Sequence, residues 1–210
     1  MNSSDKQRIK QTYDRAAGVY DIVDWLIPDA WRLKATQAAC GRVLEVGIGT
    51  GLNLPHYPAC CREIFGIDLS PGMLSRAGQR ASLCKAAVEL SVMDVQELRF
   101  DAASFDCVLA AFVFCTVPDP GKGLKECCRV LKPGGTLILL EHMGSNNKLL
   151  RRVMDWLNPV TVKFIGDHIT RDTVGLVARA GYKIQNVENL LGDVVRLVIA
   201  EKEVLNTGKN

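Results

Sequence analysis

The stretch R-V-L-E-V-G-I-G-T-G, residues 42 to 51, decides the fold. Its first half is apolar and strand-like, and its second half carries a glycine at every second position: Gly47, Gly49 and Gly51. Glycine adopts left-handed backbone angles freely and has no Cβ to keep a ligand from the main chain. We expect a strand, a turn that holds a nucleotide-like cofactor, and a helix over 51 to 56 whose free N–H groups point at it.

Two acidic residues flank this turn in the sequence. Glu45 precedes the first glycine, where a carboxylate would repel the pyrophosphate that the dinucleotide pattern G-x-G-x-x-G binds. It favours a ligand with positive charge, such as a sulfonium or an ammonium. The next strand ends in Asp68, where a carboxylate can accept hydrogen bonds from both hydroxyls of a ribose. Ser70 and Pro71 then predict a capped helix start.

Five ordered motifs resemble those of the class I S-adenosylmethionine (SAM) methyltransferases: E-V-G-I-G-T-G, G-I-D-L-S-P-G-M-L, M-D-V-Q-E-L, S-F-D-C-V and R-V-L-K-P-G-G. The resemblance spans residues 10 to 200 and implies SAM as cofactor, with S-adenosylhomocysteine as product. It also implies the binding residues. These are Glu45, Gly47, Gly49 and Gly51 for the methionine and adenosyl part, Asp68 for the ribose, Asp94 with Met93 and Val95 for the adenine edge, and Leu69, Met73 and Ala111 beside them.

Strands and helices alternate from Arg42 onward, which predicts an α/β fold with a parallel sheet and right-handed crossovers. The expected strands cover 42–47, 62–67, 87–92, 105–111, 135–141, 182–187 and 194–200, and the expected helices 51–56, 71–84, 120–131, 146–165 and 170–180. The family resemblance implies a Rossmann-like, seven-stranded, mostly parallel sheet with helices on both faces and an antiparallel last strand. We expect a helical arm over 1–40 that covers the active site, the methyltransferase domain over 41–203 and a flexible tail over 204–210.

Composition restricts the function classes. The chain has 210 residues, 48% of them hydrophobic, which is enough for one core of ordinary size. A net charge of +3 and a pI of about 8.4 are too mild to indicate nucleic-acid binding. Neither a signal peptide nor a spanning helix is evident, so we expect a cytoplasmic protein. Nothing in the sequence indicates an oligomeric state.

Eight cysteines remain to be explained. In a reducing compartment they are expected to be free thiols. No spacing of cysteine and histidine suits zinc, so no metal site is expected. Most of the cysteines are interpreted as small buried apolar side chains.

Methyl transfer from a sulfonium is a one-step displacement, so the protein mainly aligns the reacting atoms. A base is needed only when the acceptor arrives protonated. His142 follows the central strand and is one candidate, His168 lies in a polar break between helices, and Tyr20 belongs to the arm motif Y-D-x-x-A-x-x-Y-D. Each also has a purely structural interpretation, and His56 is read as structural or as part of the cleft wall.

The arm motif resembles that of UbiE-type quinone methyltransferases and of small soluble phosphatidylethanolamine N-methyltransferases. The second group is the more similar, through V-L-E-V-G-I-G-T-G-L-N-L-P-H-Y, V-P-D-P and the short chain. The segment after the central strand resembles animal methyltransferase-like enzymes that act on thiols. These resemblances imply a small-molecule or lipid acceptor, first an amine such as phosphatidylethanolamine, and as alternatives a thiol or a quinone precursor. A non-catalytic SAM-binding protein is less consistent with the intact glycine turn.

Basic and aromatic residues alternate in the arm and in the late helical region, a pattern of helices that lie on anionic membrane surfaces. A reversible, peripheral contact with the inner membrane surface is therefore one interpretation, and a solvated helix face is the other. Arg151, Arg152 and Arg171 are the candidates to hold a phosphate, because a guanidinium binds it in a bidentate way.

Overall fold

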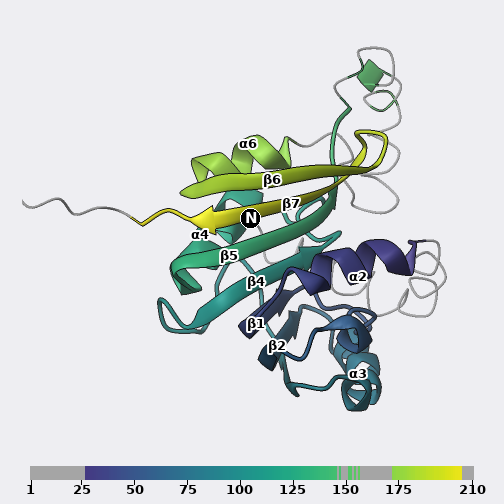
Figure 1. The fold of residues 1–210 in the computed structure, drawn as a ribbon, viewed down its shortest axis with the longest axis vertical. Helices are drawn as coiled ribbons and strands as arrows, with labels where there is room; N and C mark the ends of the chain where they lie inside the picture. Colours follow the sequence, from purple (N-terminus) through teal and green to yellow (C-terminus); the bar gives the residue numbers. More distant parts are fainter. Residues whose placement is uncertain are drawn as a thin grey trace, which may run out of the picture.

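The structure, a computed structural model, describes residues 27–145, 147, 151–152, 154, 156 and 172–204 (Figure 1). Within them seven strands form one sheet in the order β3-β2-β1-β4-β5-β7-β6. The strands are β1 (Gly41–Val46), β2 (Cys61–Asp68), β3 (Ala87–Val92), β4 (Phe105–Ala111), β5 (Leu131–His142), β6 (Tyr182–Leu191) and β7 (Val195–Lys202). Strands β1 to β5 pair in parallel, and β7 is antiparallel to both β5 and β6. The predicted seven-stranded, mostly parallel sheet is confirmed.

Helices cover both faces of the sheet (Figure 1). Residues of α2 (Asp29–Gln37) and α3 (Pro71–Arg80) belong to the core on one face, and residues of α4 (Pro120–Val130) and α6 (Thr173–Arg179) belong to the core on the other. The central strands β4 and β5 are buried on both faces, as parallel strands under two helical layers must be. This placement leaves the ends of the strands as the accessible edges of the sheet.

Several predicted boundaries are wrong, and the strand expected over 182–187 runs on to Leu191. No helix spans 51–56, because Gly51 has a φ of +82° and only the short 3-10 turn η1 (Leu54–His56) follows. The predicted helix 71–84 ends at Arg80, and η2 (Ala81–Leu83) continues it without a buried residue, so no packing supports a further α-helical turn. Strand β5 begins at Leu131 rather than at 135, since Leu131 already pairs with Phe105 of β4.

No crossover helix connects β3 to β4, and the sheet face there is covered by aromatic side chains. Phe65, Phe100 and Phe105 contact one another edge to face, with ring centroids 5.0 to 6.0 Å apart. The guanidinium carbon of Arg42 lies 4.5 Å from the centroid of the Phe65 ring. These rings and the cation stacked on them take the place of a helix at this end of the sheet.

Several predicted segments lie outside the described residues. These are most of the arm with Tyr20, the segment with His168 and Arg171, and the tail from residue 205. The division into arm, domain and tail therefore stays a prediction. Residues 151, 152, 154 and 156 are helical, as predicted for 146–165. Across the described part of the chain, no helix is both long and apolar enough to cross a bilayer.

The central strands predict where stability resides. Leu139 of β5 is fully buried, whereas Leu83 of η2 is 60% exposed. We expect Leu139→Ala to lower the free energy of unfolding by about 2–5 kcal/mol, because it loses buried contacts and leaves a cavity. The matched change Leu83→Ala should cost less than about 0.5 kcal/mol. Urea unfolding of both variants measures the difference, and equal costs would contradict the assignment of the core.

Candidate active site

The carboxyl ends of five parallel strands meet at one edge of the sheet, which we call the carboxyl edge. The registers place Val46 of β1 opposite Ile67 and Ala110, Asp68 opposite Val92, and Ala111 opposite Leu140. The glycine turn, the loop after β3, the loop after β4 and the end of β5 therefore lie beside one another. In open α/β sheets this edge is where ligands bind.

The glycine turn follows β1 directly. Gly47, Gly49 and Gly51 all have left-handed φ angles, of +62°, +56° and +82°. A Cβ on Gly47 would lie 2.5 Å from Cγ2 of Val113, and one on Gly51 would lie 3.0 Å from Cα of Ala77. A Cβ on Gly49 would have nothing within 4 Å. Two of the glycines thus serve packing, while Gly49 faces open space that a ligand can fill.

Asp68 joins the glycine turn to the following helix. Its Oδ2 accepts a hydrogen bond from Gly49 N–H at 3.0 Å, and its Oδ1 accepts one from Ser70 N–H at 2.9 Å. Ser70 caps α3 by accepting from Met73 N–H at 3.2 Å. The half-buried Asp68 thus places a carboxylate at the carboxyl edge, directly beside the glycine turn. Leu69 beside it is half-buried as well.

The loop after β3 starts at the same edge, since Met93 N–H donates to the carbonyl oxygen of Asp68 at 3.0 Å. The half-buried Asp94 accepts from both the backbone and the side-chain amide of Gln96, at 2.9 and 3.0 Å. The side-chain oxygen of Gln96, Oε1, in turn accepts a hydrogen bond from Asp119 N–H at 3.2 Å. Met93 and Val95 on either side of Asp94 are buried. The three predicted adenine contacts are therefore held in a fixed loop.

Glu45 is turned into the protein and is only 1% exposed. Its carboxylate accepts hydrogen bonds from Asn53 Nδ2 and from the Tyr57 hydroxyl, both at 2.7 Å. Arg32 of α2 donates to Asn53 Oδ1 at 3.3 Å. Burial raises the pKa of Glu45 to about 7, against the lowering effect of these hydrogen bonds and of the Arg32 charge. Glu45 thus binds the segment that follows the glycine turn, through Asn53 and Tyr57. Its direct contact with a cofactor stays a prediction.

A second buried carboxylate, Glu141 at the end of β5, anchors the loop after β4. Its Oε1 accepts from Val113 N–H at 2.8 Å and from Phe114 N–H at 2.9 Å. Phe112 just before them has a φ of +57°, a conformation that non-glycine residues rarely adopt and that often marks functional sites. The Phe112 and His142 rings lie 4.8 Å apart, so the half-buried His142 reaches the carboxyl edge beside the loop.

Sequence reasoning missed the partners of Glu45 and the anchoring role of Glu141. Asn53 and Tyr57 lie in the G-L-N-L-P-H-Y run, whose polar residues were the available signal. The sequence contains no signal for the role of Arg32, because a single arginine in a helix looks like an ordinary surface residue. Of the predicted phosphate ligands, Arg151 is half-buried and Arg152 exposed. Across the described residues, no group of three or more His, Cys, Asp or Glu is arranged to hold a metal ion.

Comparison with known proteins identifies the family. A family model for a methyltransferase domain matches residues 44–139. A phosphatidylethanolamine N-methyltransferase of Cereibacter sphaeroides is 35% identical over 69% of this chain and 73% of its own length. This chain belongs to the class I SAM-dependent methyltransferases.

Two further proteins resemble this chain, one in sequence and one in fold. A demethylmenaquinone methyltransferase of Clavibacter sepedonicus is 33% identical over 70% of this chain, which spans less than two thirds (63%) of that protein. The crystal structure of a SAM-dependent methyltransferase of Thermotoga maritima superimposes with a TM-score of 0.69, at 21% identity, over 91% of this chain and 98% of that one. The last likeness concerns the fold alone.

SAM is the methyl donor of the family, and the residues at the carboxyl edge fit it. Gly49 offers bare main chain beside open space, and Asp68 places a carboxylate next to it. The loop through Asp94 continues the same edge toward β3. The individual contacts of these residues with SAM stay predictions.

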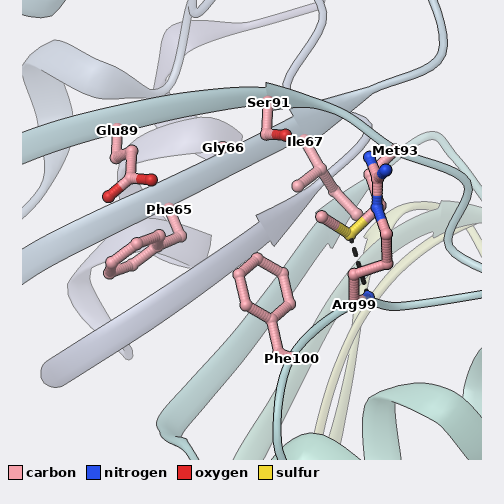
Figure 2. Close-up of a pocket in the computed structure, with 8 residues that line it drawn as sticks. All are labelled: Phe65, Gly66, Ile67, Glu89, Ser91, Met93, Arg99 and Phe100. Atoms are coloured by element: carbon pink, nitrogen blue, oxygen red, sulfur yellow. Dashed lines mark hydrogen bonds between the residues drawn. The ribbon is translucent and has the colours of Figure 1, made fainter.

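A cavity of about 270 Å³ lies elsewhere, on the face of the sheet over β2 and β3 (Figure 2). Phe65 and Phe100 face it from one side, and Glu89 and Ser91 line it along β3. It occupies the part of the sheet that lacks a crossover helix. Met93 is the one predicted cofactor residue in its lining, so the cavity adjoins the region where we expect the cofactor.

Gly49 offers a test with a matched control. Gly192, in the turn between β6 and β7, has a similar φ of +53° and equally open surroundings. This turn is separated from the glycine turn after β1 by strands β4 and β5. Gly49→Ala and Gly192→Ala should each lose about 1–2 kcal/mol of stability from backbone strain. We expect only Gly49→Ala to weaken SAM binding, by about tenfold or more, because its methyl group enters the ligand space. Calorimetric titration checks this, and equal affinities would refute the placement of SAM.

Glu45 predicts a pH effect on stability. Between the unfolded pKa of 4.5 and the folded pKa of about 7, the folded protein binds more protons than the unfolded chain at this site. Stability should therefore fall as pH rises through this window, by about 3 kcal/mol from Glu45 alone. Denaturant unfolding from pH 4.5 to 8 should show this fall in the wild type and in Glu97→Gln, whose side chain is 65% exposed. A Glu45→Gln variant should lose most of this fall. If its stability fell with pH as steeply as that of the wild type, Glu45 would not be the group responsible.

Proposed function

We propose that this methyltransferase transfers the methyl group of SAM to the amine of phosphatidylethanolamine. The observation that carries the proposal is the 35% identity to a phosphatidylethanolamine N-methyltransferase across most of both chains. Quinone methyltransferases match at 30% to 35% identity over 60% to 71% of their own length, against 73% for the phosphatidylethanolamine N-methyltransferase. They make the quinone precursor the second candidate acceptor.

The site would have two walls, the glycine turn and the loop after β4, that align the methyl donor with the acceptor. Bound SAM supplies an activated methyl group on a sulfonium. The side chain of Val113 packs against Gly47, so the loop after β4 lies directly beside the glycine turn. Glu141 holds that loop through two backbone N–H groups. Because displacement requires nucleophile, methyl carbon and leaving sulfur in line, a rigid spacing between these walls is the main catalytic contribution of the chain.

His142 would take the proton that an amine acceptor must lose before it attacks. A neutral imidazole accepts a proton at physiological pH, and His142 lies half-buried at the carboxyl edge. The Phe112 ring beside it offers a π face on which an ammonium can rest before deprotonation. Tyr20 and His168 lie outside the described residues, and their catalytic roles stay predictions.

The late helical segment would carry the contact with lipid. Arg152 and Trp156 are four residues apart on helical backbone and both exposed, with Trp156 at 78%. This spacing places a cation and an amphipathic ring on one helix face, a combination suited to an anionic membrane surface. We propose that Arg151 and Arg152, with Arg171 from outside the described residues, bind the headgroup phosphate of a cytoplasmic membrane leaflet.

A panel of acceptors tests the function. Radiolabelled SAM is incubated with the full chain and, separately, vesicles of phosphatidylethanolamine, a demethylmenaquinone and an alkyl thiol. We expect labelled monomethyl phosphatidylethanolamine as the main product. Turnover of the thiol or the quinone precursor without any labelled phospholipid would overturn the proposal in favour of that acceptor.

Two histidine variants test the base. We expect His142→Gln to lower kcat with phosphatidylethanolamine by about 100-fold or more, with unchanged SAM affinity, because the proton loses its acceptor. His56→Gln is the matched control, since His56 is also half-buried but its Nε2 faces Asp29 at 3.9 Å. It should keep its activity. A His142→Gln enzyme with wild-type kcat across the pH range would exclude His142 as the base.

A further inference from the structure

Three cysteines gather at the amino ends of β1 and β2, opposite the carboxyl edge. Cys40 immediately precedes β1, while Cys60 and Cys61 stand at the start of β2. Gly41 pairs with Cys61 in the parallel register, and Gly41 N–H donates to the carbonyl oxygen of Cys60 at 3.0 Å. Cys40 and Cys60 each immediately precede one residue of this pair, so they are neighbours across the ends of the two strands. Neighbouring strands lie about 4.8 Å apart, within the Cα separation that a disulfide spans, about 4.4–6.8 Å.

Each of the two thiols also reaches the backbone beside the other cysteine. Cys40 Sγ donates to the carbonyl oxygen of Cys60 at 3.5 Å, and Cys60 Sγ donates to that of Ala39 at 3.4 Å. A hydrogen bond with the Cys40 thiol raises the pKa of Cys60, which is the effect of a second thiol close by. Each side chain is thus directed to the chain segment that carries the other thiol.

Exposure separates this pair from the other cysteines. Cys40 and Cys60 are exposed, whereas the remaining six are buried or half-buried. The expectation of small buried apolar side chains is therefore wrong for these two. Cys61 is buried and directs its thiol to the Ala39 carbonyl at 3.4 Å. An oxidant in solution reaches Cys40 and Cys60 first.

We propose that Cys40 and Cys60 form a redox-active dithiol that closes into a disulfide when a small-molecule disulfide such as oxidised glutathione is present. One thiolate attacks a sulfur of the oxidant and displaces a glutathione thiolate, which leaves a mixed disulfide on the protein. The second protein thiolate attacks the protein sulfur of that bond and displaces the second glutathione. The oxidant is reduced to two thiols, which take up the two protons that the protein thiols lose.

The disulfide closes a chain segment that contains the predicted cofactor cradle. Between Cys40 and Cys60 lie β1, the glycine turn and Asn53, and a cross-link over this length restricts the unfolded chain. We expect the oxidised protein to melt about 5–10 °C higher than the reduced one. Because the cross-link lies at the opposite edge from Gly49 and Asp68, SAM affinity should stay within about twofold.

Peptide mapping tests the cross-link on the wild-type chain. Trypsin cuts after Lys34, Arg42 and Arg62, so Cys40 lies in peptide 35–42, and Cys60 and Cys61 lie in peptide 43–62. After oxidised glutathione, alkylation of free thiols and digestion, we expect the two peptides joined, with two hydrogen masses lost, and separated again by dithiothreitol. A closed peptide 43–62 would indicate a bond between Cys60 and Cys61, and glutathione left on unlinked peptides would indicate no pairing. Either result overturns the proposal.

Cysteine variants identify the partner within peptide 43–62. Cys61→Ser should keep both the linked peptides and the rise in melting temperature, whereas Cys60→Ser should lose both. Cys128→Ser, a half-buried cysteine on α4, is the matched control and should behave as the wild type. A link that persists in Cys60→Ser and disappears in Cys61→Ser would assign the bond to Cys61 and contradict the proposed pair. SAM binding by each variant verifies that it is folded.

Discussion

The Asp68 carboxylate holds the site together, because it accepts hydrogen bonds from Gly49 N–H and from Ser70 N–H at once. These two bonds join the turn after β1, the end of β2 and the start of α3. The turn can approach Asp68 this closely only through left-handed angles that glycine adopts at low cost. The same carboxylate that organises the backbone is thus the one expected to receive the ribose of SAM.

Two buried carboxylates, Glu45 and Glu141, hold the loops around Asp68 in place. Glu45 draws Asn53 and Tyr57 under the glycine turn, and through Asn53 it connects the turn to Arg32 of α2. Glu141 holds the loop after β4 on the acceptor side. A buried carboxylate without partners is costly, so each imposes a specific arrangement on its donors. The glycine turn and the loop after β4 are in this way held by carboxyl groups that the solvent barely reaches.

The sequence predicted most of the sheet and the cofactor class, because strand periodicity, paired acids and glycine spacing are local patterns. The predictions failed where tertiary contacts determine the local conformation. The helix expected at 51–56 gave way to a turn that carries Asn53 toward Glu45, and Glu45 itself points into the protein rather than outward. Cys40 and Cys60 are brought together only by the register of β1 and β2, which no short motif encodes.

The acceptor is harder to predict for a physical reason. Binding a sulfonium nucleoside constrains many backbone atoms, whereas aligning an acceptor can be achieved by a few side chains around Phe112 and His142. Closely related sequences can therefore share the donor site and differ in what they methylate. Under the proposed function, acceptor identity would depend on those few side chains.

A crystal structure of the full chain with S-adenosylhomocysteine would show directly where the cofactor binds. We expect ribose hydroxyls within hydrogen-bonding distance of the Asp68 carboxylate, main chain of Gly49 in van der Waals contact with the ligand, and the adenine beside Asp94. A nucleoside bound in the cavity between Phe65 and Phe100, or anywhere away from the ends of β1 and β2, would contradict this placement.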